Sequence, residues 1–217
     1  MTLRVSLVLL MLATPPARAD DWAAPLTREA FSASREYFVR VVPGKSLGDT
    51  YGFASQEKGP YARAEFYRRA QDRSYRLVAE EGLLNPVAPL EFLVADNGHL
   101  VTLDNWHNVG YGKVVAIYDA RGKLIRAYEL RELFDAEEIK RFPHSMSSIH
   151  WRNGTLYIRH DQTTALVTVA SGTGADFLFG IETGRFKYCE YQEKNYRCRG
   201  ANQPRQWAPN ASLPLER

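Results

Sequence analysis

Apolar residues along the chain recur in short runs that are rich in β-branched and aromatic side chains. Gly, Asn, Asp and Pro separate these runs, a pattern typical of strands joined by turns. The continuously apolar run Val114–Tyr118 is expected in the middle of a sheet, and the partly alternating run Ala62–Arg69 is expected to be half exposed. The predicted strands are Glu36–Val42, Ala62–Arg69, Ser74–Ala79, Phe92–Ala95, His99–Leu103, Val114–Tyr118, Leu124–Glu129, Leu156–His160, Ala165–Val169, Phe177–Ile181 and Phe186–Tyr191.

Four expected turns place a glycine just before the next strand: Gly98, Gly122, Gly154 and Gly184. Glycine suits these places because tight hairpin turns need a positive φ. Gly122 follows Gly98 by 24 residues and Gly184 follows Gly154 by 30, so residues 96–130 and 152–191 are interpreted as two copies of one unit with two hairpins each. A degenerate earlier copy is expected to start near residue 34, with its second hairpin turning at residues 71–72.

This repeat resembles bacterial secreted β-propeller repeat proteins. The segment 114–126, VVAIYDARGKLIR, is similar to the outer strands of their NHL- and YVTN-type blades. Three units are fewer than the about four to eight blades that typically close a propeller. The predicted fold is therefore all-β, with about three four-stranded antiparallel blade-like units that form an incomplete propeller, a dimer that completes one, or a plain β-sandwich.

Three segments lack the strand pattern. Residues 20–33 are predicted to contain a short helix. A second helix is predicted within residues 130–142, centred near 135–142, because Asp135 and Glu138 have capping-box spacing and Pro143 ends the segment. The tail, residues 200–217, carries three prolines and is expected to be extended.

The N-terminus has the pattern of a secretory signal peptide. Arg4 precedes the apolar run Val5–Ala13, and Ala17-Arg-Ala19 supplies small residues for cleavage. The run is shorter than the about 20 apolar residues of a membrane span, and no later segment has that length. We therefore expect a signal peptide at 1–19, one β-rich domain at 20–199, a tail at 200–217, and a periplasmic or secreted location.

Charge and composition narrow the class of protein. The 217 residues include 28 Lys plus Arg and 25 Asp plus Glu, for a formal charge of +3. Two of the positive charges, Arg4 and Arg18, lie in the predicted signal, so the remaining chain does not have the strongly basic footprint of a nucleic-acid-binding protein. Hydrophobic residues make up 45% and charged residues 24%, which is ordinary for a folded protein.

The two cysteines are predicted to form a disulfide. Cys189 and Cys198 lie in a partly alternating aromatic and polar segment on either side of residues 193–195, which indicates a hairpin with the cysteines facing each other. An oxidising compartment would join them. A redox-active pair is the alternative, but the Cys-x-x-Cys spacing is missing.

The most unusual segment is the connection between the predicted strands His99–Leu103 and Val114–Tyr118. It contains Asp104, Asn105, Trp106, His107 and Tyr111, and such polar groups around aromatic rings suit a ligand cleft. His107 oriented by Asp104 would suit general acid–base chemistry. The alternative is that these side chains only pack between sheets and bond turn amides.

A second candidate segment, Pro143–Trp151, contains His144 and His150 around three serines. A Ser–His nucleophile pair is conceivable there, but no Gly-x-Ser-x-Gly elbow exists in the sequence. The five histidines show neither His-x-x-x-His nor His-Glu-x-x-His spacing, so no metal or other cofactor is expected.

Two functions follow from these patterns. The favoured hypothesis is a non-enzymatic binding or interaction module for an unknown protein or small ligand, with no nucleic acid, no membrane span and a homodimer as one expected state. Its site would be Asp104, Asn105, Trp106, His107 and Tyr111, with His144 and His150 as a second wall. The alternative is a small periplasmic hydrolase or lyase using His107 with Asp104 or Asp161.

Overall fold

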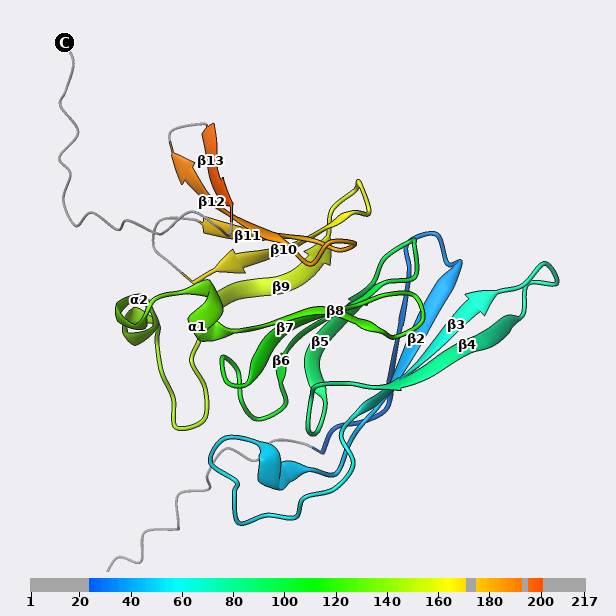
Figure 1. Ribbon diagram of the computed structural model, residues 1–217, viewed down its shortest axis with the longest axis horizontal. Helices are drawn as coiled ribbons and strands as arrows, with labels where there is room; N and C mark the ends of the chain where they lie inside the picture. The colour runs from blue at the N-terminus through cyan, green and yellow to red at the C-terminus, as the bar shows by residue number, and fades with distance from the viewer. Residues whose placement is uncertain (1–23, 171–174, 193–194, 201–217) are drawn as a thin grey trace, which may run out of the picture.

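The fold is all-β and consists of three antiparallel sheets arranged in chain order (Figure 1). A computed structural model describes residues 24–170, 175–192 and 195–200. The predicted signal peptide and nearly all of the predicted tail lie outside these residues. In each sheet the strands follow one another as hairpins, and β5 of the second sheet contacts both β1 of the first and β9 of the third.

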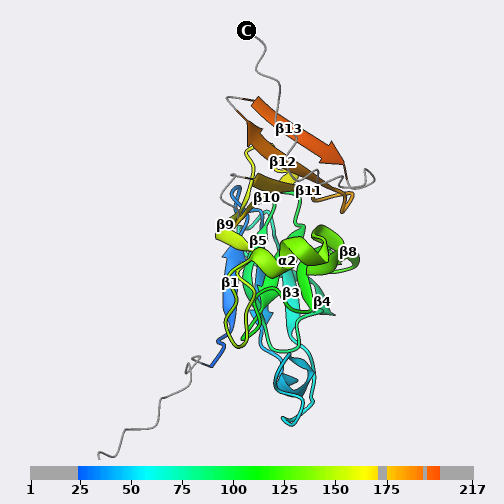
Figure 2. The ribbon, with the colours of Figure 1, turned by 90° about the vertical axis from the view of Figure 1, so that its left-hand side faces the viewer.

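The first sheet has the order β1-β2-β3-β4. Its strands are β1 (Arg28–Phe31), β2 (Tyr37–Val42), β3 (Arg63–Arg69) and β4 (Tyr75–Gly82). β1 replaces part of the helix predicted at residues 20–33, because Arg28–Phe31 pairs with β2 in full antiparallel register. The long connection from β2 to β3 contains the 3-10 turn η1 (Leu47–Asp49) and lies at the opposite end of the molecule from β12 and β13 (Figures 1 and 2).

The second sheet has the order β5-β6-β7-β8 and is the middle layer. Its strands are β5 (Pro89–Val94), β6 (Leu100–Asn105), β7 (Lys113–Tyr118) and β8 (Leu124–Glu129). All of β6 and all of β7 after Lys113 is buried, which confirms the prediction of a central strand at Val114–Tyr118. One face packs on Val39, Val41 and Phe66 of the first sheet, and the other on a larger core that includes Phe177 and Phe179 of the third.

The third sheet has five strands in the order β13-β12-β11-β10-β9, one more than the repeat predicts. Its strands are β9 (Arg152–Ile158), β10 (Thr164–Val169), β11 (Ala175–Gly180), β12 (Phe186–Gln192) and β13 (Asn195–Gly200). The additional strand is the second arm of the cysteine hairpin. Cys189 and Cys198 are direct partners across β12 and β13 and form the predicted disulfide.

Two short helices, α1 (Leu130–Leu133) and α2 (Ala136–Arg141), replace the single helix predicted over residues 130–142. The chain is extended at Phe134, whose ring is buried in the larger core, and Asp135 then starts a new helix. The predicted capping box is confirmed, since the Asp135 carboxylate accepts a hydrogen bond from the Glu138 amide and the Glu138 carboxylate accepts one from the Asp135 amide. Phe142 ends α2 directly before Pro143.

Most hairpin turns share one backbone form, in which a residue with positive φ donates its amide to the carbonyl three residues earlier. Gly98 and Gly122 have this form, and Gly184, which also has positive φ as predicted, donates to the carbonyl four residues earlier. Gly154 also has positive φ, but it lies inside β9, where the register with β10 shifts. The first hairpin turn of the third sheet is instead at Gln162 (φ 55°). The two turns of this unit are therefore at residues 162 and 184, not at 154 and 184. Arg35 and Arg73 have the same role in the first sheet, and Arg73 confirms the predicted turn after residues 71–72.

The outer face of the first sheet carries a row of alternating charges across its four strands. Arg40 bridges Glu29 (2.8 Å) and Glu65 (3.2 Å), and Arg63 bridges Glu65 (2.7 Å) and Glu80 (2.8 Å). Tyr67 donates a further hydrogen bond to Glu65 at 2.8 Å. The same face also carries an aromatic cluster of Phe31, Phe38, Tyr67 and Tyr75, so ion pairs and aromatic rings share it, while the opposite face forms the core.

Candidate functional site

The connection between β6 and β7 is held by a buried carboxylate. Asp104, which is 0% exposed, accepts hydrogen bonds from Trp151 Nε1 (2.9 Å), the Gly110 amide (3.0 Å) and Arg152 Nε (2.7 Å). Burial raises the pKa of the Asp104 carboxyl, and these three donors oppose that rise. Because no surface of Asp104 reaches solvent, the predicted site residue anchors the connection to β9 and offers nothing to a ligand.

Arg152 completes this buried network. Its side chain is 8% exposed and also donates to Glu91 Oε1 at 3.0 Å. The second oxygen of Glu91 accepts a hydrogen bond from the Leu156 amide. The network therefore joins β5 and β6 of the second sheet to β9 of the third, directly behind the loop that carries the candidate residues.

Three asparagines, Asn85, Asn105 and Asn108, fix the course of this loop from inside. Asn105 donates to the Tyr111 carbonyl at 2.7 Å and accepts from Asn85 at 2.7 Å. Asn108 donates to the carbonyls of Tyr51 (3.1 Å) and Ser147 (3.2 Å). Asn108 therefore ties together the β6–β7 connection, the η1 loop and the segment after α2, which are distant in sequence.

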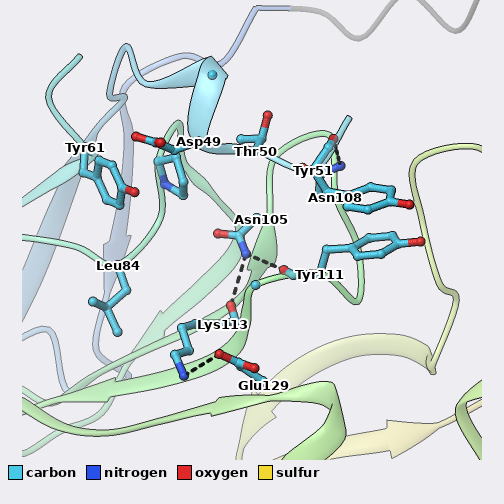
Figure 3. A pocket seen from close by; sticks show the side chains of 13 residues that line it. Asp49, Thr50, Tyr51, Tyr61, Leu84, Asn105, Asn108, Tyr111, Lys113 and Glu129 are labelled. Atoms are coloured by element: carbon cyan, nitrogen blue, oxygen red, sulfur yellow. Dashed lines mark hydrogen bonds and ion pairs between the residues drawn. The ribbon is translucent and has the colours of Figure 1, made fainter. Parts of the chain in front are cut away.

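These connections border an open pocket of about 500 Å³ (Figure 3). Its walls come from the η1 loop, from the residues just before β5, from the β6–β7 connection and from the end of β8. Of the predicted site residues, Asn105 and Tyr111 line it. The lining residues are Gly48, Asp49, Thr50, Tyr51, Tyr61, Leu84, Pro86, Asn105, Asn108, Tyr111, Gly112, Lys113 and Glu129.

Tyrosine rings stand on two sides of this pocket. Tyr51 and Tyr111 stack with their ring centroids 4.0 Å apart and their planes 5° from parallel. Tyr61 lies on the other side of Asn105 in Figure 3. Burial raises the pKa of both the Tyr111 and Tyr61 hydroxyls, with the neighbouring Tyr51 and Asp49 adding to the rise. The hydroxyls consequently stay protonated at neutral pH and can donate hydrogen bonds.

The charged residues of the pocket are paired with other residues of the chain. Asp49 contacts Lys58 at 2.7 Å and accepts a hydrogen bond from Ser46 at 2.6 Å. Lys113 contacts Glu129 at 3.0 Å, as Figure 3 shows. The Lys58 ammonium lowers the pKa of the Asp49 carboxyl, and the Lys113 ammonium lowers that of Glu129, so both carboxylates are ionised at neutral pH.

The other predicted site residues lie near the pocket but do not line it. Trp106 and His107 are half buried, and the His107 ring is 5.4 Å from that of Phe53 in the η1 loop. Burial lowers the pKa of His107, so its imidazole is mainly neutral at pH 7. This position favours a packing role against the η1 loop.

The segment after α2 contacts the β6–β7 connection, as expected if it formed a second wall of the site. The Ile149 amide donates to the Val109 carbonyl at 2.9 Å. The side chains of His144 and His150 are nevertheless exposed, and neither lines the pocket. The contact between this segment and the β6–β7 connection is therefore made by backbone groups and Ile149, not by the two histidines as predicted.

The sequence reading missed the half of the pocket that the β2–β3 connection provides. Asp49, Tyr51 and Tyr61 belong to a connection of more than 15 residues, a length that in a compact domain often accompanies function. The length of this connection and its tyrosines were the features of the sequence that could have indicated a site. Glu129 and Lys113, by contrast, sit at strand ends and had no sequence signal.

Comparisons with known proteins do not assign the chain to a family: no family model, curated protein or solved structure matches it. In the described part of the chain, no helix is long and apolar enough to cross a membrane. Within the same residues, no three His, Cys, Asp or Glu side chains are grouped as ligands of a metal ion would be.

Proposed function

We propose that the chain is a non-enzymatic binding module that holds a small ligand in the pocket between the η1 loop and the β6–β7 connection. The observation that carries this proposal is the pocket itself, which combines aromatic faces with fixed polar groups on loops held by the buried Asp104 and Asn108 networks. Its volume falls within the about 300–1,000 Å³ typical of small-molecule sites.

The environment of the candidate acids supports binding over the hydrolase or lyase alternative. The Asp104 carboxylate already accepts three hydrogen bonds in a fully buried position. Asp161 lies in the β9–β10 turn, where its carboxylate accepts from the amides of Thr163 (2.9 Å) and Thr164 (3.2 Å). Both acids thus have structural partners that account for their positions, and neither lines the pocket.

We also propose that the module acts outside the cytoplasm. The Cys189–Cys198 disulfide supports this, because such bonds persist in oxidising compartments. The sequence of residues 1–19 supports it independently. Expression in a bacterial host followed by fractionation and N-terminal sequencing tests it: a periplasmic product starting at Asp20 is expected, and an uncleaved cytoplasmic product would refute export.

The binding function is tested by an amide-resolved NMR screen of a chemically diverse small-molecule library against the folded protein. Hits should shift the amides of Gly48–Tyr51 and of Asn108–Lys113 together, because both segments line the pocket. Tyr61→Ala should weaken the hits. The matched control is Tyr157→Ala, which removes a tyrosine of similar exposure (50% against 43%) from β9 in the third sheet. A screen without hits at these amides would refute the proposal.

A further inference from the structure

The lining of the pocket suggests the chemical class of its ligand. We propose that it takes an uncharged, hydroxyl-rich ring compound, that is, a neutral saccharide of one or two units. This inference rests on the proposed binding function and deepens it. It is carried by three features of the pocket: its paired charges, its tyrosine faces and the mixture of hydrogen-bond donors and acceptors around them.

The first feature argues against a charged ligand. Lys113 is the only cation among the described residues that line the pocket, and it is bound to Glu129 at 3.0 Å and lies 3.7 Å from Glu132. An anionic ligand would have to displace these carboxylates or sit against them. A cationic ligand would similarly compete with Lys58 for Asp49. An uncharged ligand leaves all of these ion pairs intact.

The second feature is the apolar surface that the rings provide. Tyr61 stands on one side of the pocket, with Leu84 below it in Figure 3, and the stacked pair of Tyr51 and Tyr111 stands on the other. Aromatic faces are large apolar surfaces that also carry a negative quadrupole. The slightly positive C–H groups on one face of a sugar ring can pack against such a surface. A flexible polar ligand without an apolar face cannot make this contact.

The third feature is the polar rim. The Tyr61 hydroxyl is hydrogen-bonded to Asp49 and the Tyr111 hydroxyl to Tyr51. The carboxylates of Asp49 and Glu129 and these two hydroxyl oxygens offer acceptors, and the Lys113 ammonium offers a donor. A purely apolar ligand would take these groups out of water without replacing their hydrogen bonds, which is costly. Sugar hydroxyls both donate and accept, so one ligand can satisfy both kinds of group.

The test is a binding panel on the folded protein, followed by saturation-transfer NMR and by the amide shifts of the pocket. The probes are neutral disaccharides (maltose, cellobiose, N,N′-diacetylchitobiose), anionic sugars (glucose 6-phosphate, a sulfated heparin disaccharide) and an uncharged aromatic probe (indole). We expect at least one neutral disaccharide to shift pocket amides, with affinity that changes less than about twofold between low and high salt, since no net charge is neutralised.

Tyr61→Ala and Tyr111→Ala should each weaken this binding by about tenfold or more, as removal of a central aromatic contact commonly does. Tyr157→Ala should leave it unchanged. Because Tyr111 is half buried, Tyr61→Ala decides the matter if Tyr111→Ala fails to fold.

The remaining outcomes separate this inference from the proposed function. If only an anionic sugar or only the aromatic probe shifts the pocket amides, the saccharide assignment is wrong and the binding module stands. If neutral sugars bind but shift amides elsewhere, the assignment to this pocket is wrong. If none of the probes and no member of the diverse library shifts these amides, both proposals are overturned.

Discussion

Asp104 and Arg152, 48 residues apart in sequence, form a buried ion pair at 2.7 Å that joins the second sheet to the third. Asp104 has a positive φ of 56° at the end of β6, and Arg152 begins β9. The pair therefore fixes the point where the β6–β7 connection leaves its sheet. Neither residue lines the pocket, so its shape depends on a contact outside its lining.

Arg152→Met should destabilise the fold strongly while keeping the apolar part of the side chain. It leaves the Asp104 carboxylate buried without its cation, and breaking such pairs typically costs about 3–5 kcal/mol. The loss should appear as a lower urea midpoint. Arg159→Met, which removes an exposed arginine 3.8 Å from Asp161, is the control and should change stability by less than about 0.5 kcal/mol.

The same variant has a characteristic pH dependence. Burial already raises the pKa of Asp104, and loss of Arg152 should raise it further. A group whose pKa is raised in the folded state favours folding at low pH, and that contribution is lost as pH rises through the raised pKa. The defect of Arg152→Met relative to wild type should thus shrink on mild acidification. A defect that stays constant with pH would show that lost packing, not the buried charge, is responsible.

The shared hairpin turns lead to two substitutions with opposite effects. At Gly122 (φ 82°) an added Cβ would lie 2.6 Å from Glu81 Cγ and 2.8 Å from Phe66 Cε2, so Gly122→Ala should cost more than about 1 kcal/mol. Arg73 has the same left-handed backbone (φ 67°) without being a glycine. Arg73→Gly should therefore gain up to about 1 kcal/mol. Thermal and urea unfolding of both variants measures this, and effects of the same sign would contradict the common turn.

Most strands could be predicted because they carry their own local signal, whereas β1 lies in a segment predicted to contain a helix. Val114–Tyr118 is apolar throughout because β7 is buried on both faces, and Ala62–Arg69 alternates because β3 lines only one core. Gly154 was misleading, since a glycine with positive φ serves equally in a turn and in a strand irregularity. The turn at Gln162 could not be predicted, because glutamine is not a residue type that indicates a left-handed backbone.

The site was less accessible to sequence reasoning for a different reason. The sequence predicts Asp104 as a ligand-binding residue, whereas its buried pairing with Arg152 could not be predicted, because Arg152 is far away in the chain and has no local pattern. Tyr51 reaches Tyr111 only because the η1 loop folds back over the β6–β7 connection, where Asn108 holds it. Such contacts depend on how three loops pack, which strand periodicity does not encode.

Acid should weaken the outer face of the first sheet through Glu65. The Tyr67 hydroxyl and the guanidinium groups of Arg63 and Arg40 lower the pKa of this carboxyl below its ordinary value of 4.5. A lowered pKa in the folded state adds stability above the unfolded-state pKa, and that stability is lost as pH falls through the folded-state pKa. Wild type should therefore lose stability below about pH 4.5.

Glu65→Gln isolates this contribution. The variant should be less stable than wild type at pH 7, and the difference should narrow as pH falls below 4.5, the ordinary value for this carboxyl. Glu137→Gln is the control, because Glu137 is exposed and pairs with Lys140 on the surface of α2. Urea midpoints measured between pH 3 and pH 7 test the prediction. A gap between Glu65→Gln and wild type that does not narrow would mean that Glu65 is not responsible.

Removing the disulfide should loosen the last hairpin before anything else. Cys189 is fully buried, whereas Cys198 is exposed on β13, the edge strand of the third sheet. The double variant Cys189→Ala/Cys198→Ala should lose about 2–3 kcal/mol on the chain-entropy account of a short loop. Alanine is chosen because serine would bury a hydroxyl at position 189. Hydrogen exchange should accelerate most at the β13 amides, while those of β6 and β7 change only with global stability. Wild type treated with reductant should match the double variant, and unchanged β13 protection in both would show that strand pairing alone holds the hairpin.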